Sequence, residues 1–277
     1  MLIPLIAILS AAGAFALCAL TGGFETMWWL AILPGGFLLL FVLLIVLAFL
    51  ILWLICSTVD LDQPQGEEDS PFFRRLLRWY IPAVLFILQT TVHATGLEKT
   101  PGDGRFLLVC NHLSDMDPVV LLHCFRDSQL AFISKRENRD MFLVGKIMHR
   151  ILCQMINREN DREALKTILK CVDILKTDKA SVAVFPEGYT SVDGRFQNFR
   201  HGVFKIAQKA KVPIVVCTLH NTQYVFGNAR RLKRTRVEMH LLDVIQPEEF
   251  AGIPAVELGN RIHAMMAKDL GEYEEKE

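Results

Sequence analysis

Two long apolar runs at the N-terminus constrain the fold more than any other feature of this 277-residue chain. Residues 2–20 are almost wholly apolar, and residues 28–56 form a longer run with Pro34 near its start. About 20 apolar residues in a helix cross the hydrocarbon core of a bilayer. The runs therefore predict two transmembrane helices within residues 1–57, joined as a hairpin, with the second helix beginning near Phe37. The alternative is a cleaved signal peptide, but no basic segment precedes the first run.

The distribution of charge predicts which side of the membrane holds the rest of the chain. Residues 1–59 contain a single charged side chain, Glu25, whereas Arg74, Arg75 and Arg78 follow the second run. Basic residues beside membrane helices stay on the cytoplasmic side. We therefore expect an integral membrane protein whose N-terminus and whole region after residue 57 are cytoplasmic. The seven cysteines stand singly and form no C-x-x-C pair, so neither a disulfide framework nor a zinc site is expected.

Two segments connect the apolar runs to the remainder of the chain. Residues 58–70 are acidic and contain Pro64 and Gly66, which is typical of a solvated linker. Residues 71–94 combine arginines with a strongly apolar face, which predicts an amphipathic helix at the membrane interface, interrupted at Pro82. The same pattern fits a helix packed on the core of a domain, and both descriptions can hold for different faces.

From residue 95 onward, short apolar runs alternate with helical patterns. This alternation predicts one α/β domain with a mixed sheet over residues 95–277. The expected strands are residues 106–110, 129–134, 181–185, 214–219 and 236–244. The expected helices are residues 117–125, 138–152, 161–177, 202–211 and 254–270.

A histidine and an aspartate follow the first of these strands. His112 and Asp117 stand five residues apart, which on a continuous helix would turn their side chains about 140° away from each other. A turn must therefore separate them if they are to meet, and Ser114 is expected to cap the following helix with Asp117 at N3. A histidine held at one nitrogen by a carboxylate can accept a proton at the other. The alternative is a capping aspartate beside a surface histidine.

Two further features carry chemistry. Residues 185–188 read Phe-Pro-Glu-Gly and place Glu187 and Gly188 at the end of another expected strand, where α/β domains bind ligands. Arg158 follows a short apolar stretch, and its paired donors suit a phosphate. The first feature also fits an ordinary turn, and the second fits a solvated residue before a helix. No third ligand has a spacing that completes a metal site with His112 and Asp117, so no metal is expected.

Together these motifs resemble the glycerolipid acyltransferase family, of the 1-acyl-glycerol-3-phosphate acyltransferase (PlsC-like) type. The resemblance covers roughly residues 95–245 and keeps the family's motif order. The matching blocks are Asn111-His112-x4-Asp117, then Lys135-Arg136-Glu137 with Gly145 and Ile156-Asn157-Arg158, then Phe185-Pro186-Glu187-Gly188, and Val212-Pro213-Ile214-Val215.

The resemblance implies transfer of an acyl group from acyl-CoA or acyl-carrier protein to the hydroxyl of a lysophospholipid, foremost 1-acyl-glycerol 3-phosphate. His112 would be the general base and Asp117 its partner, with no covalent acyl-enzyme, cofactor or metal. Membrane lipid is an expected partner, and nucleic acid is not. The expected substrate-binding residues are Asn111, Ser114, Lys135, Arg158, Glu187 and Gly188.

Two positions depart from the family pattern. The third motif usually continues Gly-Thr-Arg-Ser, whereas residues 188–191 read Gly-Tyr-Thr-Ser and lack the arginine, which Arg195 or Arg200 could replace. Val216 stands where the fourth motif usually has a second proline. These changes keep open another acceptor: glycerol 3-phosphate, a different lysophospholipid or an amino-acid-containing lipid. A non-catalytic lipid-binding protein on the same fold is a third reading, which the intact His–Asp pair disfavours.

Overall fold

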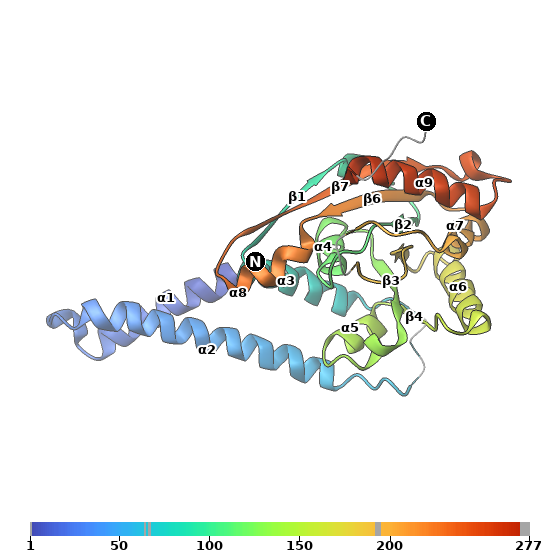
Figure 1. Ribbon diagram of the computed structural model, residues 1–277. Coiled ribbons are helices and arrows are strands. Elements are labelled where there is room, and N and C mark those ends of the chain that lie inside the picture. The colour runs from blue at the N-terminus through green and yellow to red at the C-terminus, as the bar shows by residue number, and fades with distance from the viewer. Residues whose placement is uncertain (1, 64, 66–67, 192–194, 272–277) are drawn as a thin grey trace. The chain divides into compact units, whose positions relative to one another are not determined.

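The computed structural model describes residues 2–63, 65, 68–191 and 195–271, and the chain forms two compact units (Figure 1). The first unit is Met1–Asp62 and the second is Gln63–Glu277. The boundary lies within the acidic segment expected as a linker.

The first unit is a hairpin of two antiparallel helices, α1 (Leu2–Leu20) and α2 (Trp29–Ser57). Both are long and apolar enough to cross a membrane. Every fourth residue of α1 from Ile6 to Cys18 is buried, and the two between them are the small Ser10 and Ala14. A Cβ on Gly36 of α2 would lie 3.5 Å from the Cβ of Ala14. Small residues thus let the two backbones approach closely, as in membrane helix pairs.

The second apolar helix begins at Trp29, so the expectation that it starts near Phe37 was wrong. The helix continues through Pro34, which lacks the N–H of one helical hydrogen bond. In apolar surroundings a break in the helix would leave several backbone groups without partners. One missing bond therefore destabilises the segment less than ending the helix would.

The second unit is built on a seven-stranded sheet with strand order β1-β7-β6-β2-β5-β3-β4. The strands β6, β2, β5, β3 and β4 run parallel, whereas β7 is antiparallel to β6 and parallel to β1. The sheet is therefore mixed, as predicted. The strands are β1 (Thr90–Thr95), β2 (Leu107–Val109), β3 (Leu130–Lys135), β4 (Gln154–Ile156), β5 (Ser181–Val184), β6 (Ile214–His220) and β7 (Thr235–Ile245).

Helices pack on both faces of this sheet. Alternate residues of β2, β5 and β6 share a buried cluster with α6, α7 and α9 on one face. On the other face, Phe125 at the end of α4 packs against Phe106, with ring centroids 6.1 Å apart. The helices of this unit are α3 (Pro71–Ile87), α4 (Asp117–Cys124), α5 (Val144–Arg150), α6 (Asp161–Lys176), α7 (Lys205–Ala210), α8 (Val225–Arg230) and α9 (Ala255–Leu270).

The helix expected over residues 138–152 is instead a 3-10 turn, Arg136–Asp140, followed by the short α5. Gly145 of α5 packs so tightly on the carbonyl oxygen of Arg139 that a Cβ there would clash. The chain therefore folds back on itself at this point, which one straight helix could not do.

A buried arginine attaches the amphipathic helix α3 to the rest of the second unit. Arg74 pairs with Asp69 at 2.8 Å and donates hydrogen bonds to the carbonyl oxygens of Leu130 and Ile151. The helix passes through Pro82 without the expected interruption. Buried residues flank Pro82 on both sides, and their packing offsets the lost helical hydrogen bond. The helix ends at Ile87, and its contact with a membrane stays a prediction.

Candidate active site

Four parallel strands end at one edge of the sheet, and a residue singled out in the sequence stands at or just after each end. His112 follows β2, Glu187 follows β5, Lys135 ends β3 and Arg158 follows β4. The four strands are neighbours in the order β2-β5-β3-β4. Because they are parallel, their carboxyl ends meet at the same edge, where α/β domains bind ligands.

His112 and Asp117 lie in direct contact. The Nδ1 of His112 is 2.8 Å from Oδ2 of Asp117, and a turn at residues 115–116 separates them, as the spacing requires. The same Oδ2 accepts backbone N–H groups of Leu113 at 2.7 Å and Ser114 at 2.8 Å. Since Asp117 is fully buried and its carboxylate can only accept, Nδ1 of His112 donates. The other nitrogen, Nε2, is then left as the proton acceptor.

Two further side chains contact the imidazole of His112, one at Nε2 and one stacked on the plane of the ring. Its Nε2 lies 3.0 Å from the hydroxyl oxygen of Thr190, which donates to it in this tautomer. The ring of Phe185 stacks on it with centroids 4.2 Å apart and planes inclined by 15°. The side chain of His112 retains 15% exposure, so it remains accessible to a ligand.

Ser114 does not cap α4, contrary to the expectation. The helix begins at Asp117, and the hydroxyl of Ser114 accepts the N–H of Met116, two residues on, at 3.2 Å. The reason is local geometry, because a serine hydroxyl readily bonds the backbone two residues ahead and so forms a turn. The carboxylate of Asp117 still reaches back to the N–H of Ser114, which is half of a capping box.

Glu187 is only 1% exposed, and both of its carboxylate oxygens accept backbone N–H groups. Oε1 accepts from His112 at 2.7 Å, and Oε2 accepts from Gln197 at 3.0 Å. In the reverse direction, the N–H of Ser191 donates to the carbonyl of His112 at 2.9 Å. Glu187 therefore joins the loop after β2 to the loop after β5.

Asn111 also joins two segments, here the end of β2 and its neighbouring strand β6. Its amide nitrogen donates to the carbonyl of Leu219 at 2.9 Å, and its Oδ1 accepts the N–H of Leu219 at 2.7 Å. The side chain is fully buried. It continues the pairing of β2 and β6 beyond the last backbone bond of β2 and holds the backbone next to His112.

Two arginines approach each other beyond the ends of β4 and β5. Burial and the like charge of Arg200 lower the pKa of Arg158, while Glu137 raises it by less. Arg200 lies across Gly188, whose φ is +84°, and a Cβ at this glycine would lie 2.8 Å from the Nε of Arg200. Gly188 therefore both allows the left-handed turn and leaves room for Arg200. Lys135 is exposed at the end of β3.

Comparison with known proteins places these residues in a family. A family model described as acyltransferase matches residues 91–220, which include the whole site. A probable 1-acyl-sn-glycerol-3-phosphate acyltransferase of Mycoplasma pneumoniae is 28% identical over 253 residues, covering 86% of this chain and 94% of the relative. A 1-acyl-sn-glycerol-3-phosphate acyltransferase of Chlamydomonas reinhardtii is 38% identical over 186 residues, covering 65% and 55%. Residues 91–220, which hold the whole site, thus match an acyltransferase family. The protein is an O-acyltransferase.

The fold of this acyltransferase agrees with a solved one. The crystal structure of the 1-acyl-sn-glycerophosphate (LPA) acyltransferase PlsC from Thermotoga maritima superposes with a TM-score of 0.60 at 22% identity. The match covers 73% of this chain and 81% of the solved chain. The predicted mixed α/β domain is therefore confirmed.

Some residues of the candidate site were not singled out for it in the sequence. Thr190 entered only as a departure from the family motif, yet its hydroxyl contacts His112. Phe185 was noted only as part of a motif, and Gln197 not at all. The position of Phe185 directly before Pro-Glu-Gly was a usable signal. No sequence signal marks Gln197, because its contact with Glu187 is made by its backbone N–H.

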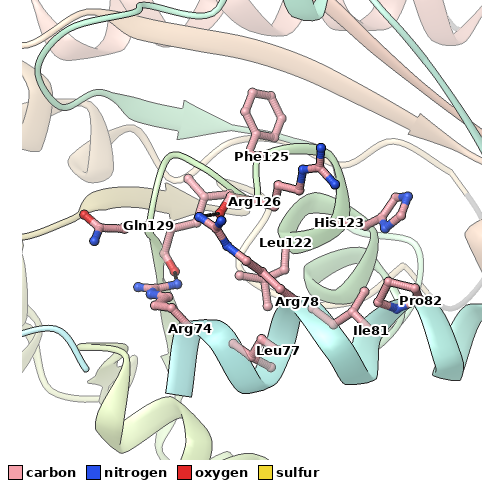
Figure 2. Close-up of a pocket in the computed structure, with 11 residues that line it drawn as sticks. Arg74, Leu77, Arg78, Ile81, Pro82, Leu122, His123, Phe125, Arg126 and Gln129 are labelled. Carbon is pink, nitrogen blue, oxygen red and sulfur yellow. Dashed lines mark hydrogen bonds between the residues drawn. The ribbon is translucent and has the colours of Figure 1, made fainter. Parts of the chain in front are cut away.

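A hollow of the acyltransferase lies between α3 and α4 and is lined by none of the site residues named above (Figure 2). Arg74 is paired with Asp69 at 2.8 Å and Arg78 with Asp127 at 2.9 Å, so these charges are already matched. Burial and the charge of Arg126 lower the pKa of His123, which is therefore neutral at pH 7. The lining residues are Arg74, Leu77, Arg78, Ile81, Pro82, Leu122, His123, Phe125, Arg126, Gln129 and Leu130.

Proposed function

We propose that this acyltransferase moves a fatty acyl group from acyl-CoA or acyl-carrier protein to the free hydroxyl of 1-acyl-glycerol 3-phosphate, giving phosphatidate. The observation that carries the proposal is the setting of His112, held at Nδ1 by Asp117 at 2.8 Å with a hydroxyl 3.0 Å from Nε2. The names of the relatives from Mycoplasma pneumoniae and Chlamydomonas reinhardtii support this acceptor.

The hydroxyl of Thr190 marks the place that the acceptor hydroxyl takes at Nε2 of His112. His112 removes the proton from the acceptor as its oxygen attacks the thioester carbonyl carbon. The carbon–sulfur bond then breaks, and the leaving thiolate receives the proton from the imidazolium. Asp117 stabilises the imidazolium between these steps. Base catalysis of this kind contributes roughly 10²–10⁴-fold, and the atoms balance without a covalent acyl-enzyme.

Arg158 and Arg200 are suited to the phosphate of the acceptor. Their guanidinium groups lie close enough for Arg200 to lower the pKa of Arg158. An anion bound between them relieves this repulsion and can take paired hydrogen bonds from each. Arg200 then replaces the arginine that the family has at the position of Thr190. Lys135, at the same sheet edge, adds a positive charge for the phosphates of the donor.

The two apolar helices suit an enzyme whose substrates reside in a bilayer. We propose that α1 and α2 cross the membrane as a hairpin, since each is long and apolar enough to do so. The first basic residues after α2 are Arg74, Arg75 and Arg78, which favours a cytoplasmic location for the catalytic unit.

The test is acyl transfer by the purified full chain in mixed micelles of detergent and phospholipid. Labelled acyl-CoA and acyl-carrier protein are each offered with 1-acyl-glycerol 3-phosphate, glycerol 3-phosphate and neutral or zwitterionic lysolipids. His112→Ala should lower kcat by roughly 10²–10⁴-fold. His93→Ala, exposed on β1, is the matched control and should keep wild-type activity. Full activity of His112→Ala would contradict the assignment of the base.

A different acceptor is the second candidate, because residues 188–191 lack the motif's arginine. Transfer to another acceptor alone, still dependent on His112, would keep the mechanism and change the substrate. No transfer from either donor to any acceptor would favour a non-catalytic lipid-binding protein.

A further inference from the structure

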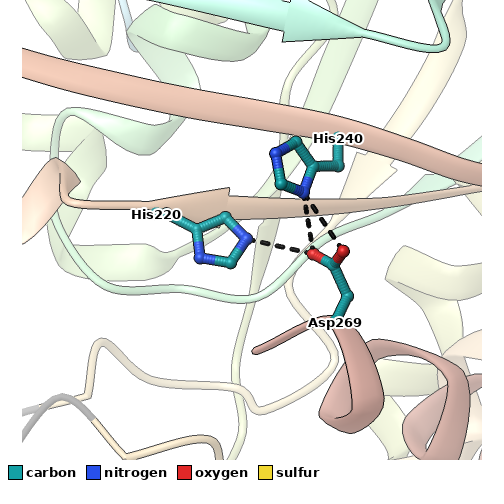
Figure 3. Close-up of side chains that lie close together, drawn as sticks. All are labelled: His220, His240 and Asp269. Atoms are coloured by element: carbon teal, nitrogen blue, oxygen red, sulfur yellow. Dashed lines mark hydrogen bonds and ion pairs between the residues drawn. The ribbon is translucent and has the colours of Figure 1, made fainter. Parts of the chain in front are cut away.

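Two histidines and one aspartate meet on β6, β7 and the last turn of α9 (Figure 3). The Nε2 of His220 lies 3.0 Å from Oδ2 of Asp269, and the Nδ1 of His240 lies 3.0 Å from the same oxygen. One nitrogen from each ring and one carboxylate oxygen all lie within 4.8 Å of one another. The mechanism proposed above uses none of the three.

The pairing of β6 with β7 brings these side chains together. Thr218 is opposite His240, and His220 is opposite Glu238, in the antiparallel register. Alternate residues of a strand share a face, so these four side chains lie on one face of the sheet. The C-terminal turn of α9 adds Asp269 to the same face.

Two of the three candidate ligands, Asp269 and His240, can be oriented by a neighbour. The hydroxyl of Thr218 donates to Asp269 Oδ2 at 2.5 Å. The Nε2 of His240, the nitrogen that does not face Asp269, lies 3.9 Å from a carboxylate oxygen of Glu238. Metal-binding histidines commonly direct their other N–H at a carboxylate, and metal-binding carboxylates are themselves hydrogen-bonded.

Charge and access also suit a cation. Oδ2 of Asp269 lies 3.0 Å from a nitrogen of each imidazole, so an acidic side chain faces both rings. The side chains of His220, His240 and Asp269 keep 25%, 28% and 24% exposure. An ion can therefore reach the cluster from solvent.

We propose that His220, His240 and Asp269 bind one divalent transition-metal ion, for which Zn²⁺ is the probe of choice. Two imidazole nitrogens and one carboxylate oxygen are ligands that Zn²⁺ prefers, and a water completes a four-coordinate site. On binding, each neutral imidazole moves its proton to its outer nitrogen, so the step needs no oxidant or reductant. In His240 that proton then faces Glu238.

The sequence predicted no metal, because the three ligands are far apart in the chain. His240 stands 29 positions before Asp269, and His220 stands 49 positions before it. Such spacings carry no motif until the strands are paired. The ion would tie the end of α9 to β6 and β7. It would also fix His220, the residue after Leu219, whose backbone Asn111 holds beside His112.

The first experiment is a titration of the chelator-treated full chain in micelles with Zn²⁺, following uptake and melting temperature. Wild type should bind one ion per chain and melt at a higher temperature when loaded, because a ligand of the native state stabilises it. His220→Ala and His240→Ala should each weaken binding by more than about tenfold. His149→Ala, on α5 between β3 and β4, is the matched control and should bind as wild type does.

X-ray absorption at the zinc edge of the loaded wild type identifies the ligands without relying on variants that could unfold. Nitrogen and oxygen ligands at about 2.0–2.1 Å are expected, whereas cysteine sulfur would appear at about 2.3 Å. Sulfur ligation, absence of uptake by wild type, or equal uptake by folded His220→Ala/His240→Ala protein would each overturn the site. In that case the three residues only join α9 to β6 and β7 by hydrogen bonds.

Discussion

The backbone N–H of His112 donates to the buried carboxylate of Glu187 at 2.7 Å. The second oxygen of that carboxylate accepts the N–H of Gln197 at 3.0 Å. The general base proposed above is therefore positioned from two directions, by Asp117 at its ring and by Glu187 at its backbone. This arrangement links the first and third sequence motifs through a single side chain.

Glu187→Gln should therefore lower both activity and stability. An amide offers one acceptor where two backbone donors need one each, and its NH₂ group would face a donor. Leaving such a buried group unsatisfied costs about 1–3 kcal/mol. We expect a lower melting temperature and a lower kcat, with Glu98→Gln, exposed after β1, as control. A variant with the stability and kcat of wild type would show that Glu187 is not needed to position His112.

Asp117→Asn should reduce kcat on the order of 10²-fold while changing KM little, because the amide cannot stabilise the imidazolium. Among the described residues, Oδ1 of Asp117 has no hydrogen-bond partner, so an amide nitrogen there would be a buried donor without an acceptor. Denaturant unfolding should show a loss of stability as well. A rise in KM at constant kcat would contradict the role of Asp117 beside the base.

Arg158→Gln and Arg200→Gln should each raise KM for a phosphorylated acceptor by about 10- to 100-fold, since a charge-assisted hydrogen bond contributes about 1.5–3 kcal/mol. The kcat should change less, because neither arginine contacts His112 in the described structure. Arg195→Gln separates the two arginines that could replace the missing one. An equal rise in KM for Arg195→Gln, with Arg200→Gln unaffected, would transfer the role to Arg195.

Stability should fall at alkaline pH because of buried thiols. Burial raises the pKa of Cys153 to about 11 and that of Cys171 to about 12, whereas an unfolded cysteine titrates near pH 8.5. Between these values the unfolded state loses a proton that the native state keeps. Each thiol therefore lowers the free energy of unfolding by about 1.4 kcal/mol per pH unit.

Urea unfolding of the full chain in micelles at pH 8 and pH 10 measures this slope. Cys171→Ala should make it shallower by one thiol's contribution. An identical slope in the variant would mean that Cys171 does not stay protonated in the native state.

Much of the fold was readable because it depends on local patterns. The apolar runs of β2, β5 and β6 are short and bounded, and the requirement for a turn between His112 and Asp117 followed from helix geometry alone. The strands β1 and β4 were missed, since both lie at sheet edges. β1 lies in a segment expected to be helical and pairs with residues 235–240, almost 150 positions later.

The contacts made by the candidate site residues were harder to predict than which residues come together there. The contact of Glu187 with substrate stays a prediction, whereas its hydrogen bonds to the backbone N–H groups of His112 and Gln197 could not be foreseen. Asn111 likewise holds Leu219 across the sheet. The residue type indicates that a buried carboxylate or amide needs hydrogen-bond partners, but only the folded structure shows which groups these are. The cluster at Asp269 could not be predicted from the sequence for the same reason.

The register of β6 and β7 shifts between Val216 and Cys217, leaving Leu242 as one extra residue on β7. Before the shift, Val216 is opposite Asp243; after it, Thr218 is opposite His240. Val216 and Thr218 share a face of β6, so Asp243 and His240 share a face of β7 although they stand three positions apart. Removing Leu242 alone would restore the regular alternation of β7 and leave Thr218 opposite His240. A relative one residue shorter at this point would therefore keep the cluster, and a gap there in a sequence alignment would not signal its loss.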